Sequence, residues 1–288
     1  MRILHLDTGR EMRGGQWQVL RLIDGLAAAG VESTLLARAD APLFLAARKQ
    51  GWRVEPISLT RAILMARRHD LIHAHDARSH TVGAIVRRSR LVVSRRVAFA
   101  VGSRWKYSRA AHYLAVSEFV KSVLIEGGVA AERITVVYDG VPILEHQGPP
   151  MSLLAHEKSA KLVGEAARLA GVELKLSADL ERDLPHAGLF VYVTHSEGLG
   201  SGVLLAMSAG VPVIASNVGG LTEVIRDGEN GLLVENTPEA IAGGIQRVLT
   251  DAAFARRLGA EARRTVRERF TVDHMVRHTM EVYRQVLH

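Results

Sequence analysis

Residues that could bind a phosphorylated, hydroxyl-rich ligand are concentrated in the stretch 189–223. Glu197-Gly-Leu-Gly200 follows an apolar run, residues 189–195, that predicts a buried parallel strand. Backbone N–H groups at the start of a helix bind phosphate, and a glutamate side chain accepts hydrogen bonds from hydroxyl groups. A phosphate cradle beside a single carboxylate indicates a nucleotide-sugar site.

The elements that must position this turn are a strand before it and a helix after it. Residues 201–209 are small, apolar and compatible with a helix, which Gly210 ends, and residues 211–216 predict the next strand. Strand, turn, helix and strand make one βαβ unit. Ligands of such folds bind at the carboxyl ends of the strands, which is where this turn lies.

A second candidate site is the segment Ile72-His-Ala-His-Asp76, at the end of an apolar strand. His73 and His75 occupy alternate positions, so their side chains point to the same side of the strand. That spacing suits a metal, but two ligands without a third do not make a site, so we predict no metal centre. The alternative is that these histidines are buried and structural.

The first part of the chain alternates predicted strands and helices. A strand at residues 3–6 is followed by a loop that contains Gly14 and Gly15, and then by an amphipathic helix that ends before Gly30. Similar alternation continues to about residue 142, which predicts an α/β domain with a parallel sheet. By itself, the Gly14-Gly15 pair is also compatible with an ordinary glycine turn.

Length and composition indicate a soluble protein of two domains. The 288 residues reach the length, about 250–300 residues, at which single hydrophobic cores stop growing. The composition, 48% hydrophobic with 23% charged residues, is ordinary for a globular chain. Charge appears already at Arg2, so no signal peptide is predicted, and the absence of cysteine is compatible with a reducing cytoplasm. The expected localisation is cytoplasmic, with a peripheral position at the inner membrane face as an option.

The net charge of +7 arises largely from one basic window. No acidic residue occurs between Asp76 and Glu118. Such a surface favours anionic lipid, a phosphate-bearing substrate or nucleic acid. A solvated face is the alternative. The side chains expected to contact an anionic membrane or a lipid-linked acceptor are Arg87, Arg88, Arg90, Arg95 and Arg96.

Several segments together resemble a known family. They are Ser196-Glu-Gly-Leu-Gly, Leu204-Leu-Ala-Met-Ser-Ala-Gly-Val-Pro-Val-Ile-Ala-Ser, Val218-Gly-Gly-Leu-Thr-Glu-Val-Ile and Asp227-Gly-Glu-Asn-Gly-Leu-Leu-Val. In this order and spacing they closely resemble the donor-binding region of the GT-B-fold glycosyltransferases of family 4, also called glycosyl transferases group 1. The chain resembles a short and divergent member.

The resemblance implies a GT-B fold, in which two Rossmann-like domains with parallel sheets face each other across a cleft. It implies an N-terminal acceptor domain at 1–143 and a donor domain at 144–270. The donor domain is expected to be shortened, because only residues 178–188 connect two of its strands. A final helix at 271–288 is expected to cross back to the first domain.

The family's site residues carry over to matching positions. His75, Glu197 and Lys158 are expected in the catalytic centre, with His73 and Asp76 on the acceptor side. The implied donor-binding residues are Gly14, Gly15, Gly198, Leu199, Gly200, Leu205, Gly219, Gly220 and Glu223. No cofactor is implied, since the donor, UDP- or GDP-linked, is a substrate. The metal-binding Asp-x-Asp signature of the other major glycosyltransferase fold does not occur.

Two positions depart from the family pattern. The second glutamate of the motif, eight residues after Glu197, is replaced by Leu205, which we expect on the cleft wall facing the ribose. Counting back five from Lys158 puts Leu153 where the family has a phosphate-binding arginine.

Three functions follow as hypotheses. A retaining glycosyltransferase is favoured by the motif array, with a nucleotide-sugar epimerase of similar fold as a minor variant. A catalytically degenerate GT-B protein that acts as a binding or scaffold partner is favoured by Leu153, Leu205 and the shortened second domain. A nucleic-acid-binding protein has only the acid-free window in its favour and no matching motif.

Overall fold

The computed structural model describes residues 1–86, 90–146 and 153–288, and of Lys158 the backbone alone. The chain forms two compact units, one of residues 1–140 with 272–288 and one of residues 141–271. Within the described ranges, none of the helices combines the length and the apolar character that crossing a membrane would require.

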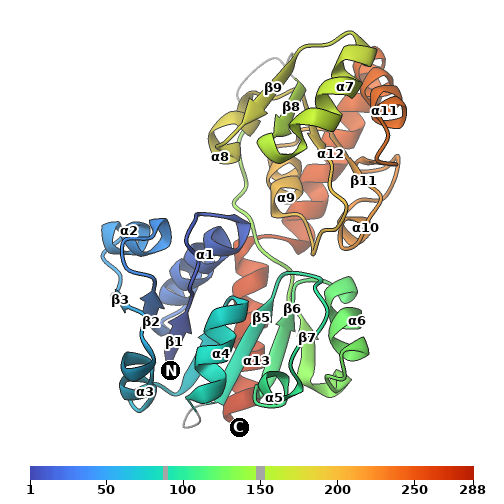
Figure 1. The fold of residues 1–288 in the computed structure, drawn as a ribbon. Helices are drawn as coiled ribbons and strands as arrows, with labels where there is room; N and C mark the ends of the chain where they lie inside the picture. The colour runs from blue at the N-terminus through green and yellow to red at the C-terminus, as the bar shows by residue number, and fades with distance from the viewer. Residues whose placement is uncertain (87–89, 147–152) are drawn as a thin grey trace. The chain divides into compact units, whose positions relative to one another are not determined.

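The first unit is built on a parallel sheet of seven strands in the order β3-β2-β1-β4-β5-β6-β7 (Figure 1). Its strands are β1 Arg2–Leu6, β2 Glu32–Ala37, β3 Val54–Pro56, β4 Leu71–Ala74, β5 Arg90–Arg95, β6 His112–Ala115 and β7 Ile134–Val136. Its helices are α1 Gly14–Ala28, α2 Pro42–Lys49, α3 Leu59–Ala66, α4 Ala77–Ile85, α5 Arg104–Tyr107, α6 Glu118–Glu126, η1 Ala131–Arg133 and α13 Val272–Leu287.

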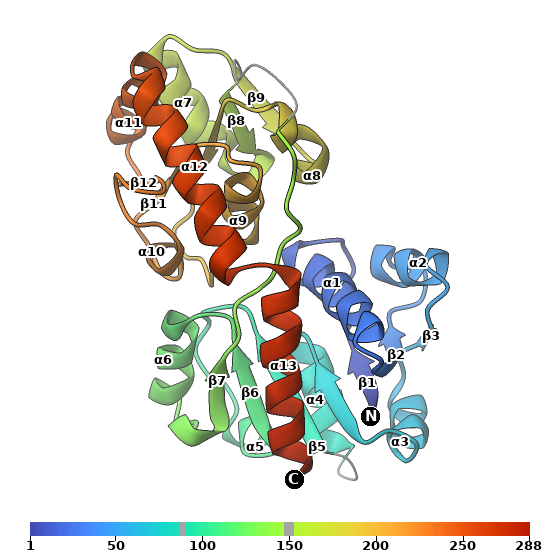
Figure 2. The same ribbon diagram turned by 180° about the vertical axis from the view of Figure 1, so that it is seen from behind.

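Helices α1 and α13 lie side by side on one face of this sheet, and α4 covers the opposite face (Figures 1 and 2). A β-carbon on Gly25 of α1 would lie 2.5 Å from Val276 Cγ2 of α13, so the small residue permits the close approach. The strands contribute Ile3, Leu71, Val92 and Leu114 to the core beneath these two helices. The last helix is therefore part of the first unit.

The second unit is built on a smaller parallel sheet in the order β12-β11-β10-β8-β9. Its strands are β8 Leu153–His156, β9 Leu174–Ser177, β10 Leu189–Tyr192, β11 Val213–Ser216 and β12 Leu232–Val234. Its helices are η2 Glu157–Ser159, α7 Ala160–Ala170, α8 Leu180–Asp183, η3 Leu184–His186, α9 Ser201–Ser208, α10 Leu221–Val224, α11 Pro238–Thr250 and α12 Ala252–Arg269. Five strands against seven confirm the expected shortening.

Close backbone contact fixes the helix that begins at the glycine turn. A β-carbon on Gly259 of α12 would lie 2.2 Å from the carbonyl oxygen of Gly210, the residue that follows α9. Only glycine allows this distance, so α12 is held tightly against the C-terminal end of α9.

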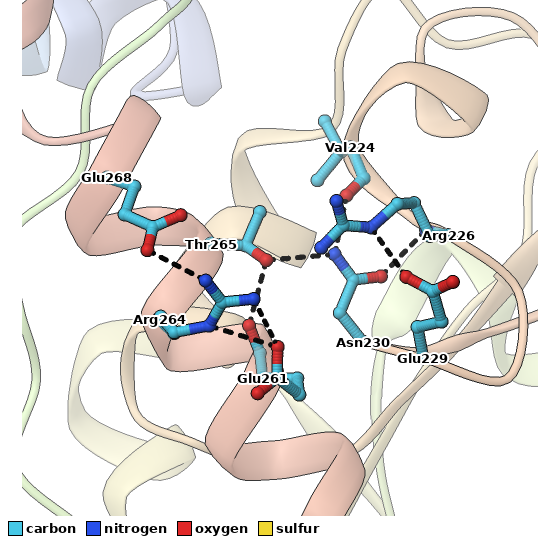
Figure 3. A network of polar contacts seen from close by, with 8 residues as sticks. All are labelled: Val224, Arg226, Glu229, Asn230, Glu261, Arg264, Thr265 and Glu268. Carbon is cyan, nitrogen blue, oxygen red and sulfur yellow. Dashed lines mark hydrogen bonds and ion pairs between the residues drawn. The ribbon is translucent and has the colours of Figure 1, made fainter.

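A polar network joins α12 to the loop after α10 (Figure 3). The fully buried Asn230 donates through Nδ2 to the Val224 carbonyl and to Thr265 Oγ1, both at 3.1 Å, and accepts from Arg226 N at 2.7 Å. Each hydrogen bond to a buried amide contributes about 1 kcal/mol. Asn230 therefore stabilises the loop after α10. This gives the matched segment Asp227-Gly-Glu-Asn-Gly a structural role.

Candidate functional site

The glycine turn connects β10 to α9, with Glu197 at its centre. Glu197 Oε1 accepts a hydrogen bond from Gly198 N at 3.0 Å, and Oε2 accepts one from the Tyr192 hydroxyl at 2.5 Å. Burial, and then the charge of Glu197, raise the pKa of Tyr192 above its ordinary value, so the phenol stays protonated. The carboxylate is therefore held in one orientation at the carboxyl end of a strand, and its remaining lone pairs can accept hydrogen bonds from hydroxyl groups.

Gly200 and Gly220 are required by the geometry of this site. Gly200 precedes α9 with φ of 94°, in the left-handed region, and a β-carbon there would lie 2.5 Å from Leu221 Cδ2. A β-carbon on Gly220 would lie 1.9 Å from the Gly198 carbonyl oxygen. Gly220 N also donates to the Glu197 carbonyl at 3.1 Å. The loop with Gly219 and Gly220 is thereby locked against the glycine turn.

The start of α9 follows directly from Gly200. The first backbone N–H groups of an α-helix have no intrahelical acceptor and carry the positive end of the helix dipole. Ser201 and Gly202 are the first two residues of α9, so this helix start can bind a phosphate. Leu199 is 2% exposed, so its side chain packs into the interior of the unit and anchors the glycine turn.

Leu205, expected on the cleft wall facing the ribose, is only 7% exposed. A carboxylate introduced at this position would be largely desolvated, so we expect Leu205→Glu to destabilise the fold. Glu223 lies in α10, next to the Gly219-Gly220 loop. Lys158 lies in η2, and its side chain is outside the described residues.

The interpretation of Leu153 is wrong. Leu153 is the first residue of β8, pairs with Leu189 and Leu174, and is 3% exposed in the core of the second unit. The count back from Lys158 assumed a loop between strand and helix, but here η2 follows β8 at once. Leu153 is an ordinary core residue. Its identity is therefore no evidence that the family's phosphate-binding arginine has been lost.

The first unit gathers polar residues at the carboxyl ends of β1 and β4. Gly14 and Gly15 are the first two residues of α1. Asp76 caps α4 by accepting from Arg78 N and Ser79 N, and it also accepts from Thr8 N at 2.6 Å and Thr8 Oγ1 at 2.7 Å. Asp76, which was predicted on the acceptor side, therefore connects the loop after β1 to the start of α4 through hydrogen bonds.

A cluster of three histidines lies between these strands and α13. His75 Nε2 is 2.9 Å from His5 Nδ1, and the rings of His73 and His75 have their centroids 4.0 Å apart. His73 Nδ1 lies 2.5 Å from the Tyr283 hydroxyl and its Nε2 lies 2.7 Å from Ser94 Oγ. His73 is 0% exposed with both nitrogens bonded, so the structure gives it a structural place and corrects its assignment to the acceptor side.

His5 is the third histidine that the sequence argument lacked. One ring nitrogen of each histidine lies within 4.8 Å of the other two. The residues nevertheless fit a metal poorly, because most of the ring nitrogens are already hydrogen-bonded and Arg96 adds positive charge nearby. The strand register could have revealed the cluster, since β1 and β4 pair with His5 opposite His73.

Asp7, the residue that follows β1, was not among the predicted site residues. It accepts hydrogen bonds from Gly9 N at 2.7 Å and from Gln16 Nε2 at 3.2 Å. Burial, and then the charge of Asp76, raise the pKa of Asp7 to about 6. The carboxyl group is 1% exposed, so its ionisation is unfavourable to folding.

Asp7→Asn is expected to stabilise the protein at pH 7.5 and to have little effect near pH 4. A pKa raised from 3.8 to about 6 means that protonated Asp7 favours the folded state below pH 3.8 and that this contribution is lost as the pH rises through 6. The total loss is on the order of 3 kcal/mol, which the asparagine variant avoids. Thermal unfolding of the wild type and the variant from pH 4 to 8 measures this loss of stability. A difference in stability that does not change with pH would contradict the raised pKa of Asp7.

Of the five arginines expected to contact a membrane, Arg95 is buried and Arg96 is partly buried. Arg96 Nε donates to Asp139 Oδ1 at 2.8 Å, with side chains 13% and 9% exposed. Arg95 is 7% exposed, donates to the Phe99 carbonyl and lies over the Tyr107 ring. Arg87 and Arg88 lie outside the described residues, and Arg90 is exposed at the start of β5. The expectation that all five arginines form one membrane-binding surface is therefore wrong.

Comparison with known proteins assigns both units to a family. Residues 12–143 match the family model described as Glycosyltransferase Family 4, and residues 172–265 match the one described as Glycosyl transferases group 1. A D-inositol 3-phosphate glycosyltransferase from Nocardioides sp. is 39% identical over 108 residues, which are 37% of this chain and 23% of that protein. An alpha-maltose-1-phosphate synthase from Mycolicibacterium smegmatis is 33% identical over 149 residues, which are 48% of this chain and 38% of that protein. The chain thus spans less than half the length of these relatives.

Solved structures share the fold over the whole chain. Anabaena HepE in complex with UDP and glucose has a TM-score of 0.86 at 18% identity, over 99% of this chain and 100% of that one. A glycosyltransferase from Rickettsia africae has a TM-score of 0.83 at 17% identity, over 99% and 98% of the two chains. With two parallel sheets, these neighbours and a family model on each unit, the chain belongs to the GT-B-fold glycosyltransferases of family 4, the glycosyl transferases group 1.

Proposed function

We propose that the protein transfers a sugar from a nucleoside diphosphate to an acceptor hydroxyl with retained configuration. The observation that carries this proposal is the locked pair of glycine loops around Glu197 at the start of α9. The likeness to HepE, a protein solved with UDP and with UDP-glucose, favours a uridine nucleotide as donor. A guanosine nucleotide is the other donor that the family resemblance suggests.

In the proposed reaction the bond between the anomeric carbon and the diphosphate oxygen breaks, and its electron pair leaves with the diphosphate. The acceptor oxygen forms the new bond on the same face of the sugar, and its proton passes to the leaving phosphate oxygen. Negative charge develops on the diphosphate, where the N–H groups of Ser201 and Gly202 stabilise it without a metal ion. Lys158 is proposed to assist as a cation.

Glu197 is proposed to hold the donor sugar by accepting hydrogen bonds from its hydroxyl groups, because Tyr192 and Gly198 N fix its orientation. In the first unit, His75 is proposed to contact the sugar or acceptor hydroxyl through Nδ1, which has no partner in the described structure. Orientation of the reactants in this way lowers the entropic part of the barrier.

A binding protein without turnover is the second candidate. Its support is Leu205, which cannot supply the ribose contact that the family's second glutamate makes. Loss of a charged hydrogen bond weakens binding by about 1.5–3 kcal/mol, which reduces donor affinity but does not by itself prevent transfer. Donor binding without either hydrolysis or transfer to any acceptor would favour this second candidate.

Glu197→Gln is expected to weaken binding of the nucleotide sugar by about tenfold or more while leaving binding of the free nucleoside diphosphate unchanged. The variant keeps an oxygen for the Tyr192 hydroxyl but removes the charge that attracts the sugar hydroxyls. Titration calorimetry with UDP, UDP-sugars and GDP-sugars, in the presence of EDTA, measures both affinities.

Glu239→Gln is the matched control, because Glu239 is an exposed glutamate of the same unit in the first turn of α11. It is expected to bind both ligands as the wild type does. Equal weakening of UDP and UDP-sugar in the Glu197 variant would place Glu197 on the nucleotide instead. A strict requirement for Mg²⁺ or Mn²⁺ would contradict metal-free stabilisation of the diphosphate.

A further inference from the structure

His75 has one paired and one unpaired ring nitrogen although its side chain is almost completely buried. It is 6% exposed, its Nε2 contacts His5 Nδ1, and its Nδ1 has no partner in the described structure. Buried polar atoms in proteins nearly always have a partner. The unpaired Nδ1 is therefore the atom that a substrate would satisfy, and its chemical behaviour depends on whether it carries the proton.

The proton on His75 is linked to a short chain of hydrogen bonds. His5 lies between His75 and Ser33, with Nδ1 at 2.9 Å from His75 Nε2 and Nε2 at 3.3 Å from Ser33 Oγ. Burial lowers the pKa of His5 to about 3 and the pKa of His75 well below its ordinary value. Each ring is therefore neutral at physiological pH and has one N–H and one lone pair.

Two arrangements of these protons satisfy both contacts. In the first, His75 Nε2–H donates to His5 Nδ1, and His5 Nε2–H donates to Ser33 Oγ, which leaves a lone pair on His75 Nδ1. In the second, both rings carry the proton on Nδ1, so that His75 presents an N–H group. Neutral imidazole side chains intrinsically favour the proton on Nε2, and the first arrangement meets this preference in both rings.

The charge of Arg96 favours the same arrangement. Arg96 is among the groups that lower the pKa of His75, so its positive charge acts on this ring. A lone pair is more stable than an N–H group in a positive potential. The ring plane is fixed independently by His73, which packs on His75 with centroids 4.0 Å apart and is itself held by Ser94 and Tyr283.

We propose that His5 is a positioning residue, which accepts a hydrogen bond from His75 Nε2 and thereby presents His75 Nδ1 as an acceptor for a substrate hydroxyl group. This inference rests on the proposed function for the hydroxyl ligand, a sugar or acceptor group. The arrangement of protons itself belongs to the free protein. A hydroxyl group bound to this nitrogen would donate, and an incoming ligand with only acceptors would be rejected.

The test compares three substitutions at position 5. His5→Phe fills the space without a polar atom, His5→Asn can place an acceptor near the former Nδ1, and His5→Gln places its amide near the former Nε2, toward Ser33. Side-chain ¹⁵N NMR of histidine-labelled protein, with His75 assigned from a His75→Gln spectrum, reads the tautomer of His75. We expect the proton on Nε2 in the wild type and in His5→Asn, and a mixture of tautomers in His5→Phe and His5→Gln.

Turnover provides a second reading of the same variants. We expect kcat to fall by about tenfold in His5→Phe and His5→Gln and to recover largely in His5→Asn, in line with loss of one oriented hydrogen bond. If His5→Phe does not fold, the pair of His5→Asn and His5→Gln makes the comparison. A wild-type His75 with its proton on Nδ1, or a tautomer that is the same in all variants, overturns the proposal. An inactive wild type with the proton on Nε2 would overturn the proposed function and leave the role of His5 intact.

Discussion

Gly220→Ala is expected to abolish donor binding and to lower the stability of the second unit. The added β-carbon would lie 1.9 Å from the Gly198 carbonyl oxygen, 2.6 Å from its carbon and 3.0 Å from Leu199 Cα. All three are backbone atoms, so the glycine turn must move to make room. Overpacking of this kind costs about 1–3 kcal/mol, and the displaced turn leads into the start of α9, which is proposed to bind the donor phosphate.

Gly243→Ala is the matched control for this substitution. Gly243 lies in α11 of the same unit, and a β-carbon there meets no atom within 4 Å. Alanine in a helix interior is more favourable than glycine by up to about 1 kcal/mol, so the control should be as stable as the wild type or more so. Thermal unfolding measures the stability of both variants, and calorimetry with UDP measures their affinity for the nucleotide. Normal UDP affinity in Gly220→Ala would show that the two loops are not coupled.

Arg96→Met is expected to destabilise the protein by about 3–5 kcal/mol, because it leaves the carboxylate of Asp139 buried without its partner. The Arg96 and Asp139 side chains are 13% and 9% exposed, so little solvent can replace the lost contact. The double variant Arg96→Met with Asp139→Asn should recover most of the loss, since it removes the unpaired charge. Denaturant unfolding of the two single variants and the double variant gives the coupling free energy.

Arg90→Ser serves as the control, since Arg90 is exposed and begins the same strand that Arg96 follows. Its substitution should change stability by no more than about 0.5 kcal/mol. An Arg96→Met variant that is as stable as Arg90→Ser would mean that Arg96 is a surface residue, as its basic neighbourhood in the sequence had suggested.

The local pattern of the sequence predicts the elements of both sheets well. Alternation of apolar runs and helical segments, with glycine at the turns, indicates the βαβ units. Ser117, a residue type that favours helix starts, caps α6 by accepting from Val120 N. The glycine turn after β10 is found in the same way. These features depend on residues that are neighbours along the chain.

Features that depend on distant residues were not predictable in this way. His5 and His75 are 70 residues apart, and only the pairing of β1 with β4 brings them together. Arg96 belongs to a basic run, but it pairs with Asp139, 43 residues away, and its side chain is only 13% exposed. The error at Leu153 came from counting through a loop that this chain does not have.

The path of the chain has a consequence for the order in which the protein is completed during synthesis. The chain leaves the first unit at Gly140 and returns to it at Val272, so the second unit is an insertion within the first. All residues of the second unit emerge from the ribosome before α13. Tyr283, the hydrogen-bond partner of His73 Nδ1, therefore appears only after the whole second unit. The unit that begins first is therefore completed only after the whole second unit has been made, and its histidine cluster cannot be assembled before α13 is available.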